Sequence, residues 1–334
     1  MSSVNHQFRL AARPTGLVKR SDFDYVEEPI RQPNAGEVLV RTLFLSLDPA
    51  MRGWMNEGKS YIPPVQIGEV MRAGGIGSVV ASQHPNFKEG DRVHGSLGVQ
   101  EYATLDAKLL NKITDDRVPL PTYLGTLGMP GMTAYFGLLD VGQAKAGETV
   151  VVSGAAGAVG TVVGQIAKIK GCRVVGIAGG QQKCDYLVQE LGFDAAVDYK
   201  AGDVKKNLRQ HCPKGVDVYF DNVGGEILDV VLTQLARKAR VVICGAISQY
   251  NSTSGVRGPA NYMSLLVNRA SMIGMVVFDY TERFPEAMRE MAGWMAAGQL
   301  KSREDIVTGF DTFPETLLKL FKGENLGKLV LKVA

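Results

Sequence analysis

The sequence predicts an α/β protein in which a doubly wound parallel sheet follows a β-rich domain. From about residue 147, short runs of β-branched apolar residues alternate with helical segments, which is the pattern of parallel strands joined by crossover helices. A glycine-rich turn at 154–160 joins the first of these runs to the first helix. The first 125 residues instead hold short strand-like runs with frequent glycines, which is typical of a compact, partly open β-barrel.

In the β-rich region, strands are expected at 37–47, 68–80, 90–95 and 101–104. The first of them ends at Asp48-Pro49, because proline has no N–H to donate to a sheet. Helical character begins at 124–139, and a strand at 328–333 is expected to rejoin the first domain. The expected domains are therefore 1–125, 126–298 and 299–334, the last being a return to the first domain.

The alternating region supplies six expected strands and the helices that connect them. The strands are expected at 149–153, 172–178, 195–199, 216–222, 239–245 and 271–278. The helices between them are expected at 159–170, 183–191, 203–211, 226–235 and 258–268, and a long amphipathic helix at 282–297 follows. Six strands with crossover helices form a doubly wound parallel sheet.

The glycines of the turn at 154–160 have the spacing of a phosphate cradle. Gly154 permits the tight turn, Gly157 lets the backbone approach a pyrophosphate, and Gly160 lets the helix pack closely on the strand. The pyrophosphate would lie at the positive end of the helix, on free N–H groups. Because the pattern is G-x-x-G-x-x-G rather than G-x-G-x-x-G, a glycine-rich turn without a ligand remains an alternative.

The residues after the second strand favour NADP(H) over NAD(H). A site for NAD usually has an acid at this strand's end, where it accepts hydrogen bonds from the ribose hydroxyls. Here no acid follows Ala178 until Asp185, and Lys183 stands where a 2′-phosphate would need neutralising. Tyr199, with the lysine after it, adds a hydroxyl and a second charge. The alternative for Lys183 is a solvated lysine in the first turn of a helix.

Composition and charge exclude several classes of function. A net charge of +3, with no basic run or aromatic ladder, argues against a nucleic-acid partner. The polar N-terminal segment lacks the apolar core of a secretory signal. The uncharged run at 149–167 has 19 residues, about the length of a membrane span, but its glycines, Ser153 and Gln165 fit a strand, a turn and a helix better. The expectation is a cytoplasmic enzyme without a membrane partner.

The four cysteines, Cys172, Cys184, Cys212 and Cys244, all fall in the alternating region. No C-x-x-C pair occurs, so neither a zinc ribbon nor a redox dithiol is indicated. Small thiols in such a sheet are usually buried, and a cytosolic chain is not expected to form disulfides.

Several motifs resemble one known family along essentially the whole chain. They are Leu45-Ser-Leu-Asp-Pro-Ala-Met-Arg52, Leu127-Gly-Met-Pro-Gly-Met-Thr-Ala-Tyr135, Gly157-Ala-Val-Gly-Thr-Val-Val-Gly-Gln-Ile-Ala-Lys168, Asp221-Asn-Val-Gly-Gly225, Cys244-Gly-Ala-Ile-Ser-Gln-Tyr-Asn251 and Glu324-Asn-Leu-Gly-Lys328. The chain resembles the medium-chain dehydrogenase/reductase superfamily, and within it the zinc-independent prostaglandin reductase/leukotriene B4 dehydrogenase group. It is most like bacterial NADPH-dependent curcumin reductases and plant alkenal double-bond reductases.

The resemblance implies a Rossmann domain, a GroES-like β-barrel domain and NADPH as the cofactor. By this resemblance the pyrophosphate would be held by Gly157, Ala158, Val159 and Gly160, and the 2′-phosphate by Lys183 and Tyr199. The nicotinamide half would be held by Asn222, Cys244, Gly245, Ala246, Ile247, Ser248, Tyr250, Met275, Val276 and Val277. Near the C-terminus, Asn325 would reach the cofactor across the cleft between the domains. Taken singly, 275–277 also fits a buried strand and 222–225 an ordinary turn.

The chain departs from the zinc-dependent members of the superfamily. Zinc alcohol dehydrogenases have Gly-His-Glu where this chain has Ile67-Gly-Glu-Val-Met71, and the first domain has no cysteine. The four histidines, at 6, 84, 94 and 211, are scattered and show no ligand spacing. No metal is expected.

Hydride transfer without a metal suits an α,β-unsaturated ketone or aldehyde, because attack at the β-carbon spreads charge into an enolate that hydrogen-bond donors stabilise. The expected donors are the ribose hydroxyl of the cofactor, Tyr262 and Tyr250, with solvent supplying the proton to the α-carbon. Tyr262 is the first choice, because related enzymes place a tyrosine in this segment; packing on a helix is its alternative. Relatives commonly have a tyrosine where this chain has Ala50, so the pocket is wider there or Tyr61 compensates. Ala50, Tyr61 and Tyr262 are the expected substrate contacts.

Two other functions remain open: a quinone reductase with the same fold and cofactor, and a non-enzymatic sensor that binds NADPH without turnover. An enoyl-thioester reductase is disfavoured, because no clustered basic patch would bind the phosphate of coenzyme A. The resemblance also implies a homodimer, often formed by edge strands of the parallel sheets, and 271–278 is the natural edge.

Overall fold

The computed structural model describes residues 4–333, which divide into two compact units. Unit 1 holds the chain up to Leu124 and again from Glu304, and unit 2 is Gly125–Arg303. The domain boundaries expected after 125 and 298 lie one and five residues from these limits.

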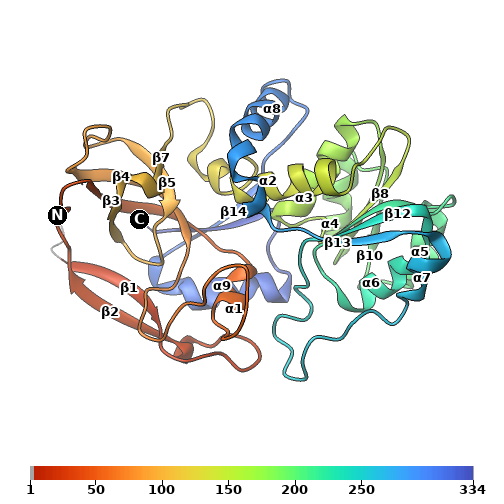
Figure 1. Cartoon of the computed structure of the whole chain (residues 1–334), viewed down its shortest axis with the longest axis horizontal. Coiled ribbons are helices and arrows are strands. Elements are labelled where there is room, and N and C mark those ends of the chain that lie inside the picture. The colour runs from red at the N-terminus through yellow and green to blue at the C-terminus, as the bar shows by residue number, and fades with distance from the viewer. Residues whose placement is uncertain (1–3, 334) are drawn as a thin grey trace. The chain divides into compact units, whose positions relative to one another are not determined.

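Unit 1 is built on an antiparallel sheet (Figure 1). Its order is β14 (Glu304–Thr308), β15 (Lys328–Lys332), β3 (Glu37–Ser46), β4 (Gly74–Ser82), β5 (Arg92–Ser96) and β7 (Leu110–Lys112), and β6 (Tyr102–Asp106) also pairs with β3. Only β14 and β15 pair in parallel within this sheet. A separate antiparallel pair is formed by β1 (Val4–Leu10) and β2 (Phe23–Pro29). The strand β15 pairs with β3, so the chain returns to the first domain as the sequence predicts.

The helices of unit 1 are short apart from α9 (Phe313–Lys322). The others are α1 (Ala50–Trp54) and the 3₁₀ helices η1 (Arg20–Asp22), η2 (Ala107–Leu109), η3 (Leu120–Leu124) and η7 (Phe310–Thr312). Helix α9 buries Phe313, Leu317 and Leu320 at helical spacing against the core that also holds Phe8 and Leu331.

Four elements of unit 1, namely β1, β2, β14 and α9, were not predicted from the sequence. In β1 the reason is visible, because Asn5 and Gln7 are both 6% exposed although they are polar. Asn5 Nδ2 donates to the carbonyl of Tyr102 at 2.8 Å, and Gln7 Nε2 donates to Gln100 Oε1 at 3.0 Å. Hydrogen bonds therefore pair the buried polar side chains of this strand. A search for apolar residues at its inward positions does not find it.

Unit 2 is a six-stranded sheet in which every pairing is parallel. Its order is β10 (Ala195–Asp198), β9 (Arg173–Ala178), β8 (Thr149–Ser153), β11 (Val216–Asp221), β12 (Leu235–Ile243) and β13 (Ser271–Gly274) (Figure 1). Counted along the chain this is 3-2-1-4-5-6, the Rossmann order, which reverses direction between β8 and β11. The predicted fold class, a Rossmann sheet with an antiparallel β domain, is confirmed.

Helices cover both faces of this sheet. They are α2 (Met129–Phe136), α3 (Ala158–Ile169), α4 (Gln181–Asp185), α5 (Val204–His211), α6 (Gly225–Leu232), α7 (Met263–Asn268) and α8 (Phe284–Ala296), with π-helical turns η4 (Gly137–Val141) and η5 (Tyr186–Glu190) and the 3₁₀ helix η6 (Val277–Arg283). On one face, Leu208 of α5, Leu228 of α6 and Leu265 of α7 pack with Val151 and Ile177 of the strands. Helix α3 and η5 lie on the other face.

Several expected elements of unit 2 have different limits, among them the helix expected at 258–268, which begins only at Met263. The helix expected at 226–235 ends at Leu232, and β12 begins already at Leu235. Lys238 adopts a left-handed conformation (φ +64°), and the register with β11 shifts there, so a bulge conceals the start of the strand. The strand expected at 271–278 ends at Gly274, because the chain turns into η6.

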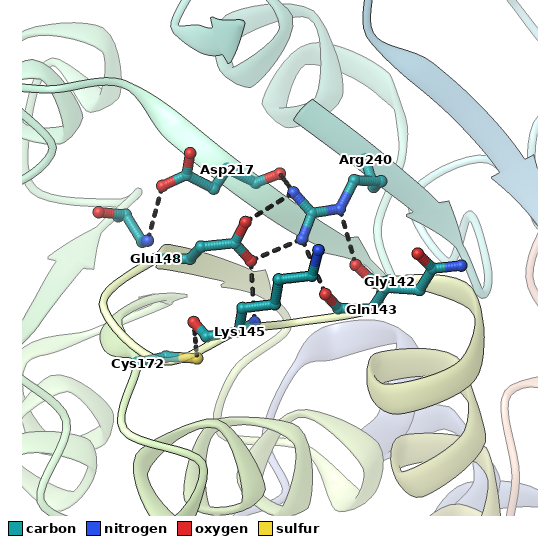
Figure 2. A network of polar contacts seen from close by, with 8 residues as sticks. Gly142, Gln143, Lys145, Glu148, Cys172, Asp217 and Arg240 are labelled. Carbon is teal, nitrogen blue, oxygen red and sulfur yellow. Dashed lines mark hydrogen bonds and ion pairs between the residues drawn. The ribbon is translucent and has the colours of Figure 1, made fainter. Parts of the chain in front are cut away.

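A network of polar contacts joins the amino ends of the central strands (Figure 2). The Arg240 guanidinium donates to both carboxylate oxygens of Glu148, at 3.0 and 2.6 Å, and to the carbonyls of Gly142, Gln143 and Asp217. The fixed fork of the guanidinium matches the carboxylate in a bidentate pair. The network ties the loop before β8 to β11 and β12.

Candidate functional site

The glycine-rich turn leaves β8 and opens α3 at the carboxyl edge of the sheet. Gly154 has a left-handed backbone (φ +57°), and its carbonyl accepts the Gly157 N–H at 2.9 Å. Gly157 caps α3, whose first hydrogen bond runs from Thr161 N–H to the Gly157 carbonyl at 3.0 Å. The N–H groups that precede this bond have no intrahelical acceptor and lie at the positive end of the helix. They belong to Ala158, Val159 and Gly160.

The third glycine of the turn is required by close packing. A Cβ at Gly160 would lie 2.4 Å from the carbonyl oxygen of Gly154 and 2.7 Å from the Cα of Ala155. Both atoms belong to backbone, so no side-chain movement would make room. A Cβ at Gly157 would lie 3.2 Å from the same oxygen. The turn is thus a bare backbone cradle of the kind that fits a pyrophosphate.

The turn after β9 brings together the residues expected at the adenosine end. Gly180 is left-handed (φ +96°), and its carbonyl accepts the N–H of Lys183, which lies half-buried in the first turn of α4. Tyr199 follows β10, is 43% exposed and lies against Gly179. Asp198 Oδ1 accepts the N–H of Gly180 at 2.8 Å. Lys183 and Tyr199 therefore flank one glycine turn.

Asp221, at the carboxyl end of β11, lies at the centre of a buried hydrogen-bond cluster. Its Oδ1 accepts the hydroxyls of Ser153 and Tyr219, both at 2.8 Å, and the N–H groups of Val223 and Gly224, both at 3.0 Å. Among the described residues its Oδ2 has no hydrogen-bond partner, although the residue is fully buried. Burial, followed by the charge of Asp221, raises the pKa of Tyr219 well above its usual value.

The same cluster joins three strand ends beside the point where the sheet reverses. The backbone N–H of Asn222 donates to Ser153 Oγ at 2.9 Å, and its side-chain Nδ2 donates to the Ser153 carbonyl at 2.8 Å. The N–H groups of Cys244 and Gly245 donate to the Asp221 carbonyl at 2.9 and 3.1 Å. Asn222 was among the predicted site residues, whereas Asp221 was not; the signal for it is an acid directly after the apolar run at 218–220.

The segment after β12 folds back onto the turn that leaves β11. The N–H of Ile247 donates to the Asn222 carbonyl, and Ser248 donates from both its N–H and its hydroxyl to the Val223 carbonyl. The hydroxyl oxygen of Tyr250 accepts the Ala246 N–H at 3.1 Å. This contact fixes the phenol at the backbone of the segment. Burial raises the pKa of the Cys244 thiol to about 12.

The remaining predicted residues of unit 2 differ in exposure. Met275 and Val277 are 8% and 9% exposed, Val276 is half-buried, and the Met275 N–H donates to the Ile243 carbonyl at 3.1 Å. Tyr262 directly precedes α7 and is 59% exposed. It is therefore not packed into the helix interface that was its structural alternative.

Three predicted residues belong to unit 1. Ala50 is the first residue of α1 and half-buried, while Tyr61 is 57% exposed. Asn325 is 9% exposed, and its Nδ2 donates to the Gly327 carbonyl at 2.9 Å. The turn that holds Asn325 leads directly to Lys328 at the start of β15.

Lys328 joins that turn to the end of β3. Its ammonium group donates to the Leu47 carbonyl and to Asp48 Oδ1, both at 2.7 Å, and the residue is 2% exposed. Ser46 Oγ donates to the second carboxylate oxygen of Asp48 at 2.5 Å. The two family-like motifs at 45–52 and 324–328 thus meet in one ion pair, whose lysine is buried and whose aspartate is partly exposed.

The donor groups that a metal site needs do not converge in residues 4–333. No three or more His, Cys, Asp or Glu side chains in this range are placed to hold a metal ion together. His6 instead pairs with Glu101 at 2.6 Å and Glu27 at 3.4 Å, and burial lowers the pKa of His94. In the same range, no helix has both the length and the apolar character needed to cross a membrane.

Comparisons with known proteins match the chain from end to end. A family described as the N-terminal domain of oxidoreductase matches residues 6–113, and one described as zinc-binding dehydrogenase matches residues 158–293. YfmJ of Bacillus subtilis is 50% identical across 100% of this chain and 99% of its own. The NADPH-dependent curcumin reductase of Escherichia coli is 44% identical across 99% of this chain and 97% of its own. The crystal structure of CurA from Vibrio vulnificus in complex with NADPH, 44% identical, superposes with a TM-score of 0.93 across 98% of this chain and 99% of that one.

Proposed function

This chain belongs to the medium-chain dehydrogenase/reductase superfamily, in the group of prostaglandin, curcumin and alkenal reductases, and we propose that it uses NADPH to reduce the C=C bond of α,β-unsaturated ketones or aldehydes. The observation that carries the proposal is the bare glycine cradle of α3 together with the lysine and tyrosine that flank the turn after β9. A relative named for NADPH-dependent reduction of curcumin, 44% identical over nearly the whole chain, supports the same choice of cofactor and reaction.

The proposed cofactor contacts follow the carboxyl edge of the parallel sheet. The free N–H groups at 158–160 would hold the pyrophosphate, because they lie at the positive end of α3. Lys183 and Tyr199 would hold the 2′-phosphate with a charge and a hydroxyl. Asn222, the segment 244–250 and residues 275–277 would hold the nicotinamide half, and Asn325 would add a contact from unit 1. When bound, NADPH supplies the hydride.

The side chains next to the substrate have an electrostatic task. Negative charge builds on the carbonyl oxygen as the double bond is reduced, and a hydroxyl that donates a hydrogen bond to this oxygen stabilises the transition state. Tyr262 is the proposed donor, since its exposed phenol is available to a ligand. Tyr250 is the second choice, because its oxygen is already held by the Ala246 N–H.

An oxidation assay tests the reaction and the cofactor together. Loss of NADPH absorbance is followed with a 2-alkenal, an aromatic enone, a curcumin-type dienone and a quinone, with NADH in parallel. Turnover of the enones with a saturated-carbonyl product is expected. Turnover of the quinone alone would instead assign a quinone reductase, and tight NADPH binding without any turnover would assign a sensor.

Two lysines provide a matched comparison for the cofactor. Lys183→Gln should raise KM for NADPH by about ten-fold or more, which corresponds to one charge-assisted hydrogen bond, and leave KM for NADH nearly unchanged. The exposed Lys214, in the turn before β11, serves as the control, because Lys214→Gln removes the same charge elsewhere in unit 2. Equal effects of the two substitutions would contradict a 2′-phosphate contact at Lys183.

Tyrosine variants test the proposed hydrogen-bond donor. Tyr262→Phe should lower kcat by about ten-fold or more while the Kd of NADPH stays within about two-fold, because only the charge on the substrate depends on the hydroxyl. Unchanged kcat would remove Tyr262 from the mechanism and leave Tyr250→Phe as the next variant to measure.

Substrate size is proposed to depend on Ala50 and Tyr61 of unit 1. Ala50→Tyr should raise KM for a curcumin-type dienone more than KM for a small 2-alkenal, because the larger side chain narrows the pocket. Tyr61→Ala should raise KM for the dienone if Tyr61 supplies the aromatic contact in place of residue 50. Parallel changes for both substrates would show that neither residue selects by size.

We also propose a homodimer that forms through β13. This strand is the last in the sheet order, so one of its edges is unpaired within the sheet, and Ile273 on it is 39% exposed. Leu266 and Val267 of α7 are 69% and 65% exposed nearby in the sequence. Light scattering should give twice the chain mass for the wild type, and Ile273→Lys should shift it toward the monomer. A monomeric wild type would contradict the proposal.

A further inference from the structure

The turn after β9 has no side chain at the position where NAD sites use an acid. β9 ends at Ala178, and Gly179 and Gly180 follow. In this fold an acidic side chain near this strand end accepts hydrogen bonds from the ribose hydroxyls of NAD. The absence of that acid is a feature of the sequence. The structure shows which group occupies the space of that acid.

The phenol ring of Tyr199 fills the space that a side chain at Gly179 would need. A Cβ at this position would lie 2.7 Å from both Cζ and Oη of Tyr199 and 2.8 Å from its Cε1. Unbonded carbon atoms normally keep about 3.5 Å apart, so the two groups compete for one volume. Gly179 lies outside the left-handed region, unlike Gly180 at φ +96°. The backbone therefore accepts another residue at 179, and the three atoms nearest to its Cβ would all belong to the ring.

The strand next to this turn holds it in position. Asp198 Oδ1 accepts the N–H groups of Gly180 and Lys200, both at 2.8 Å, and the Tyr199 N–H donates to the Ala178 carbonyl at 3.1 Å. The carboxylate thereby joins the ends of β9 and β10. These hydrogen bonds of the backbone on either side of Tyr199 hold its ring over Gly179.

We infer that Gly179 determines the choice of cofactor, because its missing side chain leaves room for the Tyr199 ring and that ring excludes the carboxylate an NADH site would need. The inference rests on the proposed use of NADPH and deepens it. Selectivity then has two physical sources, which are the positive charge of Lys183 and steric exclusion by Tyr199. A larger residue at 179 and the phenol cannot share this volume, so such a residue would force the ring, which is 43% exposed, away from its position over Gly179.

Calorimetric binding of adenosine 2′,5′-bisphosphate and 5′-AMP to the full chain isolates the adenosine end from catalysis. Gly179→Ala should weaken the bisphosphate by about ten-fold or more and 5′-AMP by less than about two-fold, because only the bisphosphate uses the Tyr199 hydroxyl. Gly293→Ala is the matched control, since a Cβ at Gly293 of α8 meets no atom within 4 Å. Unchanged bisphosphate binding in Gly179→Ala would overturn the inference.

A double-mutant cycle separates the steric argument from a general disturbance of the turn. In a Tyr199→Ala background, Gly179→Ala should cost nothing further, because the ring with which it competes is gone. Additive losses would show that the two residues act independently and would also overturn the inference.

The converse variant tests exclusion directly. Gly179→Asp combined with Tyr199→Ala should bind NADH at least about ten-fold more tightly than the wild type, since the carboxylate now has space to meet the ribose hydroxyls. NADH affinity at or below that of the wild type would contradict exclusion. A wild type that binds neither NADPH nor NADH would instead refute the proposed function, whereas equal affinity for both would refute only the cofactor selectivity.

Discussion

Replacing Lys328 by Met should destabilise unit 1 by about 3 kcal/mol, because the substitution breaks a buried ion pair from one side. The ammonium group donates at 2.7 Å to both Asp48 Oδ1 and the Leu47 carbonyl and is 2% exposed. Leaving the carbonyl without a donor costs about 1–3 kcal/mol, and losing a charge-assisted bond costs about 1.5–3 kcal/mol. Water recovers part of this sum, because the Asp48 side chain is 27% exposed.

The assay must report on unit 1 alone, since the chain has two units and two tryptophans, Trp54 in unit 1 and Trp294 in unit 2. In a Trp294→Phe background, Trp54 fluorescence during urea unfolding follows unit 1. Asp48→Asn and the double variant with Lys328→Met complete a cycle, whose coupling should be about 1.5–3 kcal/mol. A loss below about 1 kcal/mol for Lys328→Met, or additive single losses, would refute a pair that stabilises the fold.

Three further predictions concern packing, pH and thiol chemistry. Gly164→Ala should destabilise unit 2 by about 1–3 kcal/mol, because the added Cβ would lie 1.8 Å from Cζ of Phe193. Phe193→Leu in the same chain should recover part of this loss. An unchanged free energy of urea unfolding for Gly164→Ala would contradict the packing. The hydrogen bond to Glu101 raises the pKa of His6, so the protonated histidine stabilises the fold. The wild type should therefore be more stable than His6→Gln by about 0.5 kcal/mol at about pH 5 and should lose this advantage as the pH rises through the raised pKa. Thermal melts that show the opposite trend would contradict this prediction. Burial raises the pKa of three cysteine thiols to about 11 and that of a fourth to about 12. A disulfide reagent at about pH 8 should therefore react quickly only after urea is added, because few thiolates are present in the folded chain. Rapid labelling of the folded chain would contradict this prediction and show that a thiol is accessible. The first three thiols are Cys172, Cys184 and Cys212, which are buried, and the fourth is Cys244, which is partly exposed.

The parallel sheet could be predicted from the sequence, because its strands are apolar on both faces and read as continuous runs. The strand at Thr149–Ser153 agrees residue for residue with the expectation, and so does the start of β13 at Ser271. The strand β1 and the start of β12 were missed for identifiable reasons. β1 fills inward positions with hydrogen-bonded Asn5 and Gln7, and a bulge at Lys238 separates the first residues of β12 from the apolar run that was recognised as a strand.

In the candidate site, the positions of the turns could be predicted from the sequence better than the contacts between residues. The glycine turn and Lys183 could be placed because a strand, a glycine pattern and a helix follow one another along the chain. The contact between Gly179 and Tyr199, and the cluster on Asp221, join segments far apart in sequence. No periodicity encodes such contacts, because they depend on which strands become neighbours in the sheet.

The Arg240 network has a consequence for how readily this protein could acquire new specificities. Arg240 and Glu148 fasten the amino ends of the central strands, whereas the glycine turn, the turn after β9 and the segment at 244–250 all leave carboxyl ends. The residues that fasten the sheet and the residues proposed to bind the cofactor therefore lie at opposite edges of one sheet. Libraries that randomise the turns after β9 and β12 should yield many folded proteins with altered ligands, whereas libraries at the Arg240 edge should yield mostly unfolded ones.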